Sequence, residues 1–270
     1  MPDRMLEGQV ALVTGAGRGL GRAFAERLAA LGCHIAVHGM REHGPSEYGG
    51  NQTLSDVANS IAETHRVRTV RILADLTQVK DIERTVATAT TELGPIDVLV
   101  HNAGGDIAAA GGKPDPNDVV HIKAEDVRAV IDRNLMSTIF VCQRVAQGMM
   151  ERRRGRIVTI GSVAGSKGRT NGSIYATAKA AAAHFTRCLA DQTRPYGVTV
   201  NVLAPGDTRT ERFLATRSVD PARLADGGTL DRIATVDEVA RVVEFLAGPL
   251  GAFVSGQVLR VDGASQSWPA

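Results

Sequence analysis

Apolar runs of strand length alternate along the chain with segments in which apolar residues recur at helical spacing. The runs predict seven strands, at Val10–Val13, His34–His38, Val70–Leu73, Val98–His101, Ile157–Ile160, Thr199–Leu203 and Val258–Val261. The helical spacing predicts six helices, at Leu20–Leu31, Leu54–Thr64, Val79–Leu93, Asp126–Arg152, Tyr175–Thr193 and Val236–Leu246. Strands that alternate with helices favour right-handed crossovers, and hence a doubly wound α/β fold. We expect one parallel seven-stranded sheet with helices on both faces.

The chain contains no internal repeat and no linker-like stretch, so we expect residues 1–270 to form a single domain. Three stretches between predicted elements are longer than such a fold requires, at 41–53, 104–118 and 207–231. Each follows the carboxyl end of a predicted strand, which is where a doubly wound sheet binds its ligand. Loops of this length are usually functional or mobile.

The composition narrows the class of protein without deciding its function. Hydrophobic residues make up 43% of the chain and aromatic residues only 4%, so the predicted core is aliphatic. A net charge of +2 gives no signal for binding nucleic acid or a membrane surface, and no apolar run has transmembrane length. The three cysteines, Cys33, Cys142 and Cys188, are scattered and lack metal-ligand spacing. They suit a reducing compartment, so we expect a cytoplasmic protein without a metal site.

Residues 14–21, which read TGAGRGLG, join the first predicted strand to the first predicted helix. Glycines at such a turn let the backbone approach a pyrophosphate, whose charge then lies at the N-terminus of the helix. The spacing is G-x-x-x-G-x-G rather than the commoner G-x-G-x-x-G. The context favours a dinucleotide-binding loop, and the alternative is a glycine-rich turn without a ligand.

A second candidate site combines a hydroxyl, a phenol and an ammonium in one short stretch. Tyr175 and Lys179 are four residues apart in a predicted helix and therefore share one of its faces. A phenol is a poor acid or base at neutral pH, and a neighbouring cation lowers its pKa toward the working range. Ser162 follows the strand predicted at Ile157–Ile160, so it and Tyr175 can face the same ligand oxygen. A Ser-His-Asp hydrolase is excluded because the G-x-S-x-G elbow is absent around Ser162.

Together and in this order, the two motifs resemble those of the short-chain dehydrogenase/reductase family in its compact single-domain form. Further matches extend the resemblance along nearly the whole chain, from an adenine contact after the third strand to a nicotinamide loop after the sixth. The resemblance implies a Rossmann-type fold. It also implies cofactor contacts at Gly15, Gly19, Leu20, Gly21, Asp75, Leu76, Asn102, Ala103, Gly104, Tyr175, Lys179, Pro205, Gly206 and Thr208.

The family resemblance implies reversible hydride transfer between a nicotinamide cofactor and a small-molecule carbonyl/alcohol pair, in the class EC 1.1.1.-. The implied catalytic residues are Asn134, Ser162, Tyr175 and Lys179. Tyr175 would act as general acid/base, and Ser162 would position the reacting oxygen. Lys179 would lower the Tyr175 pKa and hold the nicotinamide ribose, while Asn134 would anchor a water in the proton path. The alternative is a non-catalytic dinucleotide-binding sensor, which would need only the glycine loop.

The choice between NADP(H) and NAD(H) depends on the charges near the end of the second predicted strand. An NAD site places Asp or Glu about 20 residues after the glycine motif, but the tip of this strand carries no carboxylate. Two cations, Arg18 and Arg41, are available for a 2′-phosphate instead, and guanidinium groups bind phosphate well. We therefore expect NADP(H). NAD(H) is the alternative, because Glu42 lies close to the expected acidic position.

The helices predicted at 126–152 and 175–193 carry many small apolar residues, which permit close helix approach. By resemblance these two helices form one interface between subunits, and the region of the last strand forms a second. Two isologous interfaces generate a tetramer, so we expect a homotetramer, with a dimer as the alternative. The same resemblance implies that the stretch 207–231 forms a substrate lid.

Overall fold

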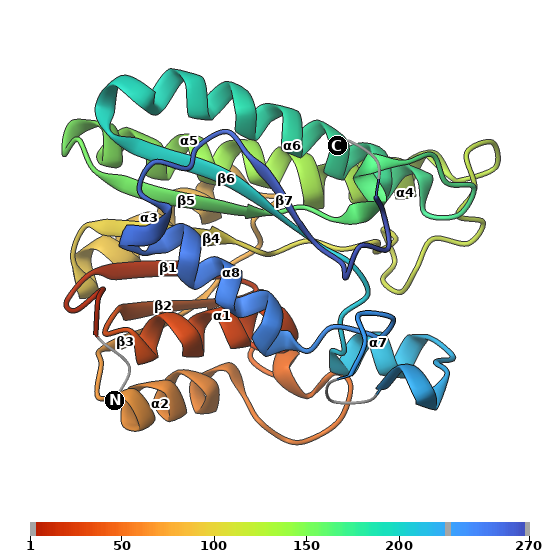
Figure 1. Ribbon diagram of the computed structural model, residues 1–270, viewed down its shortest axis with the longest axis horizontal. Helices are drawn as coiled ribbons and strands as arrows, with labels where there is room; N and C mark the ends of the chain where they lie inside the picture. The colour runs from red at the N-terminus through yellow and green to blue at the C-terminus, as the bar shows by residue number, and fades with distance from the viewer. Residues whose placement is uncertain (1–3, 225–227, 268–270) are drawn as a thin grey trace.

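The seven predicted strands form one parallel sheet. The computed structural model describes residues 4–224 and 228–267. Its strands are β1 (Val10–Thr14), β2 (His34–Gly39), β3 (Thr69–Leu73), β4 (Ile96–His101), β5 (Gly155–Ile160), β6 (Val198–Pro205) and β7 (Val258–Val261). Their order is β3-β2-β1-β4-β5-β6-β7 (Figure 1), and all neighbouring strands are parallel. The strand order reverses between β1 and β4, so their carboxyl ends border the crevice in which such a sheet binds its ligand.

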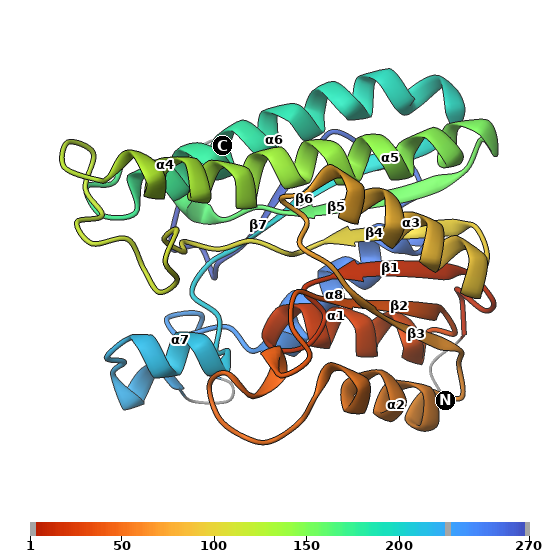
Figure 2. The same ribbon diagram turned by 180° about the vertical axis from the view of Figure 1, so that it is seen from behind.

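Helices cover both faces of the sheet, which confirms the predicted fold class. They are α1 (Gly19–Ala30), α2 (Leu54–His65), α3 (Val79–Leu93), α4 (Ala124–Ile131), α5 (Ser137–Glu151), α6 (Ser173–Thr193), α7 (Glu211–Thr216) and α8 (Val236–Ala247). Helices α1, α2 and α8 lie on one face, and α3, α5 and α6 lie on the other (Figure 1, Figure 2). Helix α7 stands apart from both layers. Of the residues described, no helix is long and apolar enough to cross a membrane.

The core divides into one cluster on each side of the sheet, because successive side chains of a strand point to opposite faces. Val13 belongs to the cluster that contains Phe24 of α1 and Val243 of α8. Its neighbour Leu12 belongs to the cluster that contains Val141 of α5. Strand β1 is buried along its whole length. Covering both faces in this way explains why the strands read as continuous apolar runs in the sequence.

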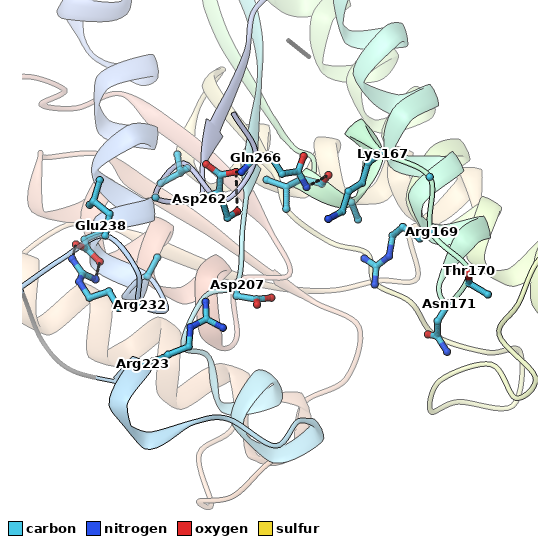
Figure 3. A pocket seen from close by; sticks show the side chains of 18 residues that line it. Lys167, Arg169, Thr170, Asn171, Asp207, Arg223, Arg232, Glu238, Asp262 and Gln266 are labelled. Atoms are coloured by element: carbon cyan, nitrogen blue, oxygen red, sulfur yellow. Dashed lines mark hydrogen bonds and ion pairs between the residues drawn. The ribbon is translucent and has the colours of Figure 1, made fainter. Parts of the chain in front are cut away.

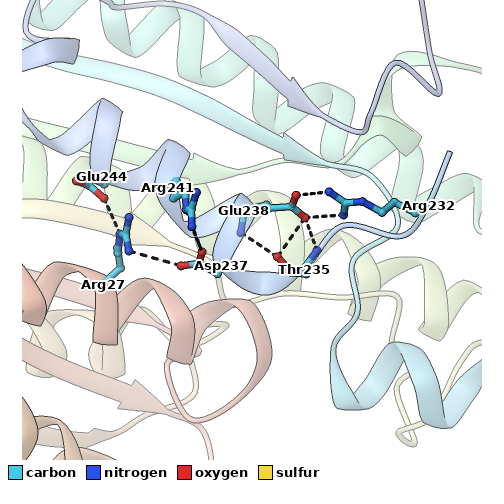
Figure 4. Close-up of polar contacts among 7 residues, drawn as sticks. All are labelled: Arg27, Arg232, Thr235, Asp237, Glu238, Arg241 and Glu244. Atoms are coloured by element: carbon cyan, nitrogen blue, oxygen red, sulfur yellow. Dashed lines mark hydrogen bonds and ion pairs between the residues drawn. The ribbon is translucent and has the colours of Figure 1, made fainter. Parts of the chain in front are cut away.

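Polar contacts fix the start of α8 and join this helix to α1 (Figure 4). Arg27 of α1 binds the carboxylate of Glu244. Thr235 and Glu238 form a capping box, in which each side chain accepts a hydrogen bond from the backbone N–H of the other residue. Hydrogen bonds from Arg232 and Thr235 lower the pKa of Glu238 to about 2. The helix therefore begins at a fixed point directly after the stretch 207–231.

The helix predicted at 126–152 is interrupted in the structure, so that prediction is corrected. A π-helical turn at Asp132–Met136 separates α4 from α5. The Ser137 hydroxyl donates to the carbonyl of Arg133, and the Thr138 hydroxyl donates to the carbonyl of Asn134, each at 2.7 Å. These side chains satisfy carbonyl groups that the wider turn leaves without their usual backbone partner. Hydrophobic spacing could not indicate the turn, because helix continues on both sides of it.

The stretch 207–231 contains a short helix that the sequence pattern did not indicate. Helix α7 begins after Thr210, whose hydroxyl accepts the N–H of Phe213 at 3.2 Å. A 3₁₀ helix follows at Pro221–Leu224, and residues 225–227 of the stretch lie outside the described residues. None of the residues of α7 is buried. This helix therefore contributes no side chain to the core.

Candidate active site

A cleft of 1120 Å³ opens at the carboxyl ends of the strands. Every predicted cofactor-binding and catalytic residue except Asn134 lines it. These residues follow the ends of strands or lie in the first turns of α1 and α6, so the sheet topology collects them from distant parts of the chain. The part of the chain that the structure describes has no group of three or more His, Cys, Asp or Glu side chains that could hold a metal ion.

In the glycine loop, residues 14–21, the backbone conformation and the close packing require glycine at several positions. Gly15 and Gly19 have positive φ values of 65° and 51°, in the backbone region that favours glycine. Gly21 lies against the loop itself, where a Cβ would collide with the carbonyl oxygen of Gly15. Helix α1 begins at Gly19 with no side-chain cap and no acidic residue in its first turn. Its first N–H groups are therefore left for an anion, and the loop fits the pyrophosphate of a dinucleotide.

The Thr14 hydroxyl joins the ends of β1 and β4. It accepts the N–H groups of Asn102 and Ala103, both at 3.0 Å. Its own proton therefore goes to His101 Nδ1, 3.1 Å away. The side-chain amide of Asn102 donates to the carbonyl oxygens of Thr14 and Gly15, each at 3.2 Å. The glycine loop and the segment that follows β4 are consequently tied into one unit, and the amide of Asn102 supports the loop.

Two buried histidines brace the same strand ends in their neutral form. His38 accepts the N–H of Gly15 at Nδ1 (3.2 Å) and donates from Nε2 to the carbonyl of Ala74 (3.1 Å). Burial lowers the pKa of His38 to about 4 and the pKa of His101 to about 3. Both rings are uncharged at neutral pH, and their hydrogen-bond partners set their tautomers.

These two rings predict an acid-sensitive fold. A histidine in the unfolded chain has a pKa of about 6.5, so the unfolded state binds more protons than the folded state below that pH. The contribution of the rings to the free energy of unfolding is complete above pH 6.5 and is lost as the pH falls toward 4. We expect a loss of about 2 kcal/mol per ring between pH 7 and pH 5, measured by urea unfolding. The His38→Asn variant should lose about half as much, and an unfolding free energy independent of pH in this range would contradict the assignment.

Ser162, Tyr175 and Lys179 come together at the end of β5. The Ser162 hydroxyl accepts the N–H of Ala164 at 3.1 Å, and it lies near enough to the phenol of Tyr175 to lower the pKa of that phenol. Helix α6 places Lys179 one turn after Tyr175, with Nζ 5.7 Å from the centre of the phenol ring. Lys179 is only 6% exposed and donates to the carbonyl of Ile160 at 2.8 Å. Burial lowers the pKa of Lys179 to about 8, so the ammonium is still charged at neutral pH.

The phenol of Tyr175 differs from the sequence-based expectation in its electrostatics. We expected Lys179 to lower its pKa, but burial dominates and raises that pKa above its ordinary value. The nearby Ser162 hydroxyl and the charges of Arg212 and Arg169 oppose the rise. The side chain still faces the cleft. The phenol is therefore protonated at neutral pH and is placed to donate a proton to a ligand oxygen.

Asn134 is the one predicted site residue outside the lining of the cleft. It is fully buried in the π-helical turn, where its Oδ1 accepts the N–H of Gly105 at 2.9 Å. Its Nδ2 donates to the carbonyls of Gly105 (2.9 Å) and Val130 (2.8 Å). A Cβ at Gly104 would lie 2.7 Å from this Oδ1 and 3.5 Å from the Nζ of Lys179. Asn134 therefore fixes the segment that leaves β4 and approaches Lys179 across Gly104.

The remaining predicted cofactor contacts are held by local hydrogen bonds. Asp75 and Leu76 follow β3, and the Asp75 carboxylate accepts the N–H and the hydroxyl of Thr77 at 3.0 and 2.9 Å. Beyond β6, the Thr208 hydroxyl donates to the carbonyl of Gly206 at 3.1 Å. Both segments line the cleft, one on the side of β3 and the other where the chain enters α7.

Arg18 and Arg41 meet at a carboxylate that the sequence analysis did not single out. Glu47 Oε2 lies 2.8 Å from Nη1 of Arg18 and 3.0 Å from Nη2 of Arg41. The Arg18 guanidinium also lies over the ring of Tyr48, 4.6 Å from its centre. Partial burial acts to raise the pKa of Glu47, but Arg18 and Arg41 lower it overall. The two predicted phosphate ligands therefore share one internal anion at the edge of the cleft.

Glu42, the acid nearest to the position expected in an NAD site, is engaged elsewhere. Its carboxylate accepts the N–H of Ser55 at 3.0 Å and pairs with Arg71 at 2.6 Å. Hydrogen bonds from Ser55 and then from Arg71 lower the pKa of Glu42 to about 2. Glu42 is not among the described residues that line the cleft. It therefore supports α2 and β3 and does not face a ribose.

The N-terminus of α1 can bind a pyrophosphate, and the protonated phenol of Tyr175 can donate to a ligand oxygen. Together these two features are typical of a dinucleotide-dependent oxidoreductase. Comparison with known sequences identifies the family within this class. A family model described as short chain dehydrogenase matches residues 9–219. The chain belongs to the short-chain dehydrogenase/reductase family, which confirms the resemblance drawn from its motifs.

Relatives match over nearly the whole chain. A cyclohexanol dehydrogenase from Rhodococcus sp. (strain TK6) is 39% identical over 270 residues, which cover 97% of this chain and 98% of the relative. A 3-oxoacyl-(acyl-carrier-protein) reductase from Escherichia coli (strain K12) is 34% identical, over 95% of this chain and 97% of its own. Among solved structures, a 7α-hydroxysteroid dehydrogenase complexed with NADH and 7-oxo glycochenodeoxycholic acid superimposes with a TM-score of 0.81. It is 27% identical and covers 97% of this chain and 96% of its own.

Proposed function

We propose that the protein interconverts a ketone and a secondary alcohol with NADP(H), a reaction of the class EC 1.1.1.-. The observation that carries this proposal is that Ser162, Tyr175 and the buried Lys179 line the cleft that the glycine loop borders, with Nζ of Lys179 5.7 Å from the centre of the phenol ring. The bound cofactor supplies or accepts the hydride. The protein supplies position, a proton and electrostatic stabilisation.

Each of the four predicted catalytic residues has a separate part in this proposal. In the reductive direction, the phenol of Tyr175 donates its proton to the carbonyl oxygen as that oxygen gains negative charge. The Ser162 hydroxyl donates a hydrogen bond to the same oxygen and fixes its position. The Lys179 ammonium stabilises the phenolate that remains and holds the nicotinamide ribose. Asn134 orders the segment after β4 and anchors a water in the proton path to Lys179.

The reaction class is tested by following the oxidation of NADPH and NADH over a panel of ketones, aldehydes and quinones. We expect oxidation that requires both the protein and a carbonyl substrate. Tight binding of a cofactor without its oxidation by any member of the panel would favour a non-catalytic sensor instead.

For the cofactor, we propose that the 2′-phosphate of NADP(H) displaces the Glu47 carboxylate and binds to Arg18 and Arg41. Two guanidinium groups that already share one anion at the edge of the cleft support this. The engagement of Glu42 with Ser55 supports it too, since no acid at that position faces the ribose. NAD(H) is the alternative, because Glu47 neutralises part of the positive charge and because the related steroid dehydrogenase was solved with NADH.

The two arginines yield a prediction about affinity. Arg18→Ala and Arg41→Ala should each weaken NADP binding by about tenfold or more, because a charge-assisted hydrogen bond contributes about 1.5–3 kcal/mol. NAD binding should change little, since NAD lacks the 2′-phosphate. Titration calorimetry with both cofactors measures the difference. Arg22→Ala, which removes a pair with Glu26 on α1, is the matched control. A wild-type protein that prefers NAD by kcat/KM would overturn the cofactor proposal.

Glu47→Gln gives the opposite prediction. Without the competing carboxylate, both guanidinium groups are available to the phosphate, so we expect NADP to bind about tenfold more tightly. NAD affinity should stay unchanged. An unchanged NADP dissociation constant, measured by the same calorimetry, would show that Glu47 does not compete with the phosphate.

We further propose that the protein is a cytoplasmic homotetramer. Its three cysteines are free thiols, as suits a reducing compartment. Beside the edge strand β7, Leu250 is 79% exposed and Phe253 is fully exposed, and a second subunit would cover such side chains. Light scattering should therefore return four times the 28.5 kDa chain mass. A monomer mass at micromolar concentration would refute the assembly.

A further inference from the structure

We propose that the substrate of this enzyme carries a carboxylate close to its reacting carbonyl or alcohol carbon, and that Arg212 and Arg169 bind that carboxylate. The proposal rests on the proposed function and names the class of substrate: oxo acids and hydroxy acids. It is carried by two arginines that line the cleft from separate segments of the chain and whose charges act on Tyr175. One comes from α7 and the other from the loop between β5 and α6.

Arg212 lies on α7 and extends over the segment that leaves β4. Its Nη2 donates to the backbone carbonyl of Asp106 at 3.2 Å. Its Nη1 comes so near Gly105 that a Cβ there would lie 2.7 Å away, and Gly105 has a φ of +141°. A guanidinium has five N–H donors in a planar fork. Within residues 4–224 and 228–267, the bond to Asp106 is the one hydrogen bond that Arg212 donates from its side chain, so most of the fork is available to a ligand.

Arg169 lines the cleft from a different segment of the chain. It lies in the loop between β5 and α6 and lines both the main cleft and an adjoining cavity of 640 Å³. Figure 3 shows its side chain pointing into this adjoining cavity, toward the lid that carries Arg223. Arg169 forms no ion pair and no side-chain hydrogen bond with any described residue. It stands where the cleft and the cavity meet, so it can reach a ligand that occupies either.

Both guanidinium groups act on the reacting phenol. The charges of Arg212 and Arg169 lower the pKa of Tyr175, whereas the Asp106 carboxylate raises it. The lining of the cleft around Tyr175 therefore includes three cations, Lys179, Arg212 and Arg169, and the anion of Asp106. The net charge beside the reacting oxygen is positive, which attracts an anionic substrate.

Two of the carboxylates that line the cleft, those of Asp106 and Asp207, have partners other than Arg212 and Arg169. Asp106 Oδ2 accepts the side-chain amide of Asn117 at 2.8 Å, and Arg212 bonds to the backbone of Asp106 and not to its carboxylate. Asp207 pairs with Arg217 at 2.8 Å. The charge of the two arginines is thus not neutralised by an ion pair in the described part of the chain. Planar guanidinium groups match the geometry of a carboxylate, and such pairs form charge-assisted hydrogen bonds.

The test uses pairs of ketones that differ only in charge: acetoacetate, levulinate and 4-acetylbenzoate, each beside its methyl ester. With the preferred cofactor, we expect at least one acid to be reduced with a kcat/KM about 10- to 100-fold above that of its ester. Arg169→Gln and Arg212→Gln should each remove most of this advantage, with a far smaller change in the kcat/KM of the ester, and Arg212→Lys should restore part of it. Arg241→Gln, on the exposed side of α8 and outside both cavities, is the charge-matched control.

Two further measurements separate binding of the carboxylate from damage to the fold. The affinity for the cofactor, measured by calorimetry, should be the same in both glutamine variants as in the wild type. Added salt should raise the KM of the acid and leave the KM of the ester in place, because screening acts on the charged pair alone.

The outcomes distinguish this inference from the proposed function. Reduction of cyclohexanone or of the esters, with no acid exceeding its ester, would overturn the carboxylate site and leave the reaction class intact. An acid preference that survives in both glutamine variants would also overturn it. Absence of cofactor oxidation with every ketone, charged or neutral, would overturn the proposed function and this inference with it.

Discussion

Replacement of Tyr175 by phenylalanine is expected to remove nearly all turnover and to leave cofactor affinity unchanged. The variant keeps the ring and loses only the hydroxyl, which lies in the same cleft as Ser162. Loss of a general acid typically lowers the rate by about 10²–10⁴-fold. Steady-state kinetics with any reduced ketone measures kcat, and calorimetry measures the dissociation constant of the cofactor.

A matched control is available on the surface. Tyr196 lies outside both cavities, 36% exposed, with its ring beside Arg153. Tyr196→Phe also deletes a phenolic hydroxyl and should keep full activity. Turnover of Tyr175→Phe within a few-fold of the wild type would rule out its role as the proton donor.

Lys179→Met is expected to lower both the turnover and the affinity for the cofactor. The ammonium is buried beside the phenol, so its loss removes the cation that stabilises the phenolate and, in our proposal, a ligand of the ribose. We expect kcat to fall by about 10²-fold or more and the cofactor to bind about tenfold more weakly. The pKa of Lys179 is lowered to about 8 by burial, so the ammonium loses its proton as the pH rises through that value. Wild-type activity should decline above pH 8, and the variant should lack this decline.

Lys80→Met provides the control for this change, since Lys80 is exposed on α3. It should alter neither kcat nor cofactor affinity. If Lys179→Met lowers kcat but binds the cofactor like the wild type, the ribose contact is wrong and only the electrostatic role stands.

The fold could be predicted from the sequence because the five inner strands, β2, β1, β4, β5 and β6, are largely buried on both faces. Leu12 and Val13 point to opposite sides of the sheet and are both fully buried, so each strand leaves a continuous apolar run in the sequence. The residues that form the cleft could also be predicted, because a doubly wound sheet brings its strand ends together.

What escaped the sequence analysis depends on contacts between residues far apart in the chain. Glu47 lies in a loop without periodicity, and nothing local indicates that it meets Arg18 and Arg41. Arg212 on α7 and Arg169 in the loop between β5 and α6 are far apart in the sequence, so their combined charge on Tyr175 is visible only in three dimensions. Burial of the phenol, which reverses the expected direction of its pKa shift, likewise depends on the whole fold.

Glu47 would also affect how quickly the nucleotide leaves the site after each turnover. A carboxylate that returns to Arg18 and Arg41 as the phosphate leaves would stabilise the emptied site and hasten dissociation of the spent nucleotide. In many enzymes product release limits the overall rate. If NADP(H) binds as proposed, the 2′-phosphate is remote from the nicotinamide, so this exchange of anions would weaken the binding of the oxidised and the reduced nucleotide equally. The Glu47 carboxylate would thus shorten the residence time of the nucleotide without favouring its oxidised or its reduced form.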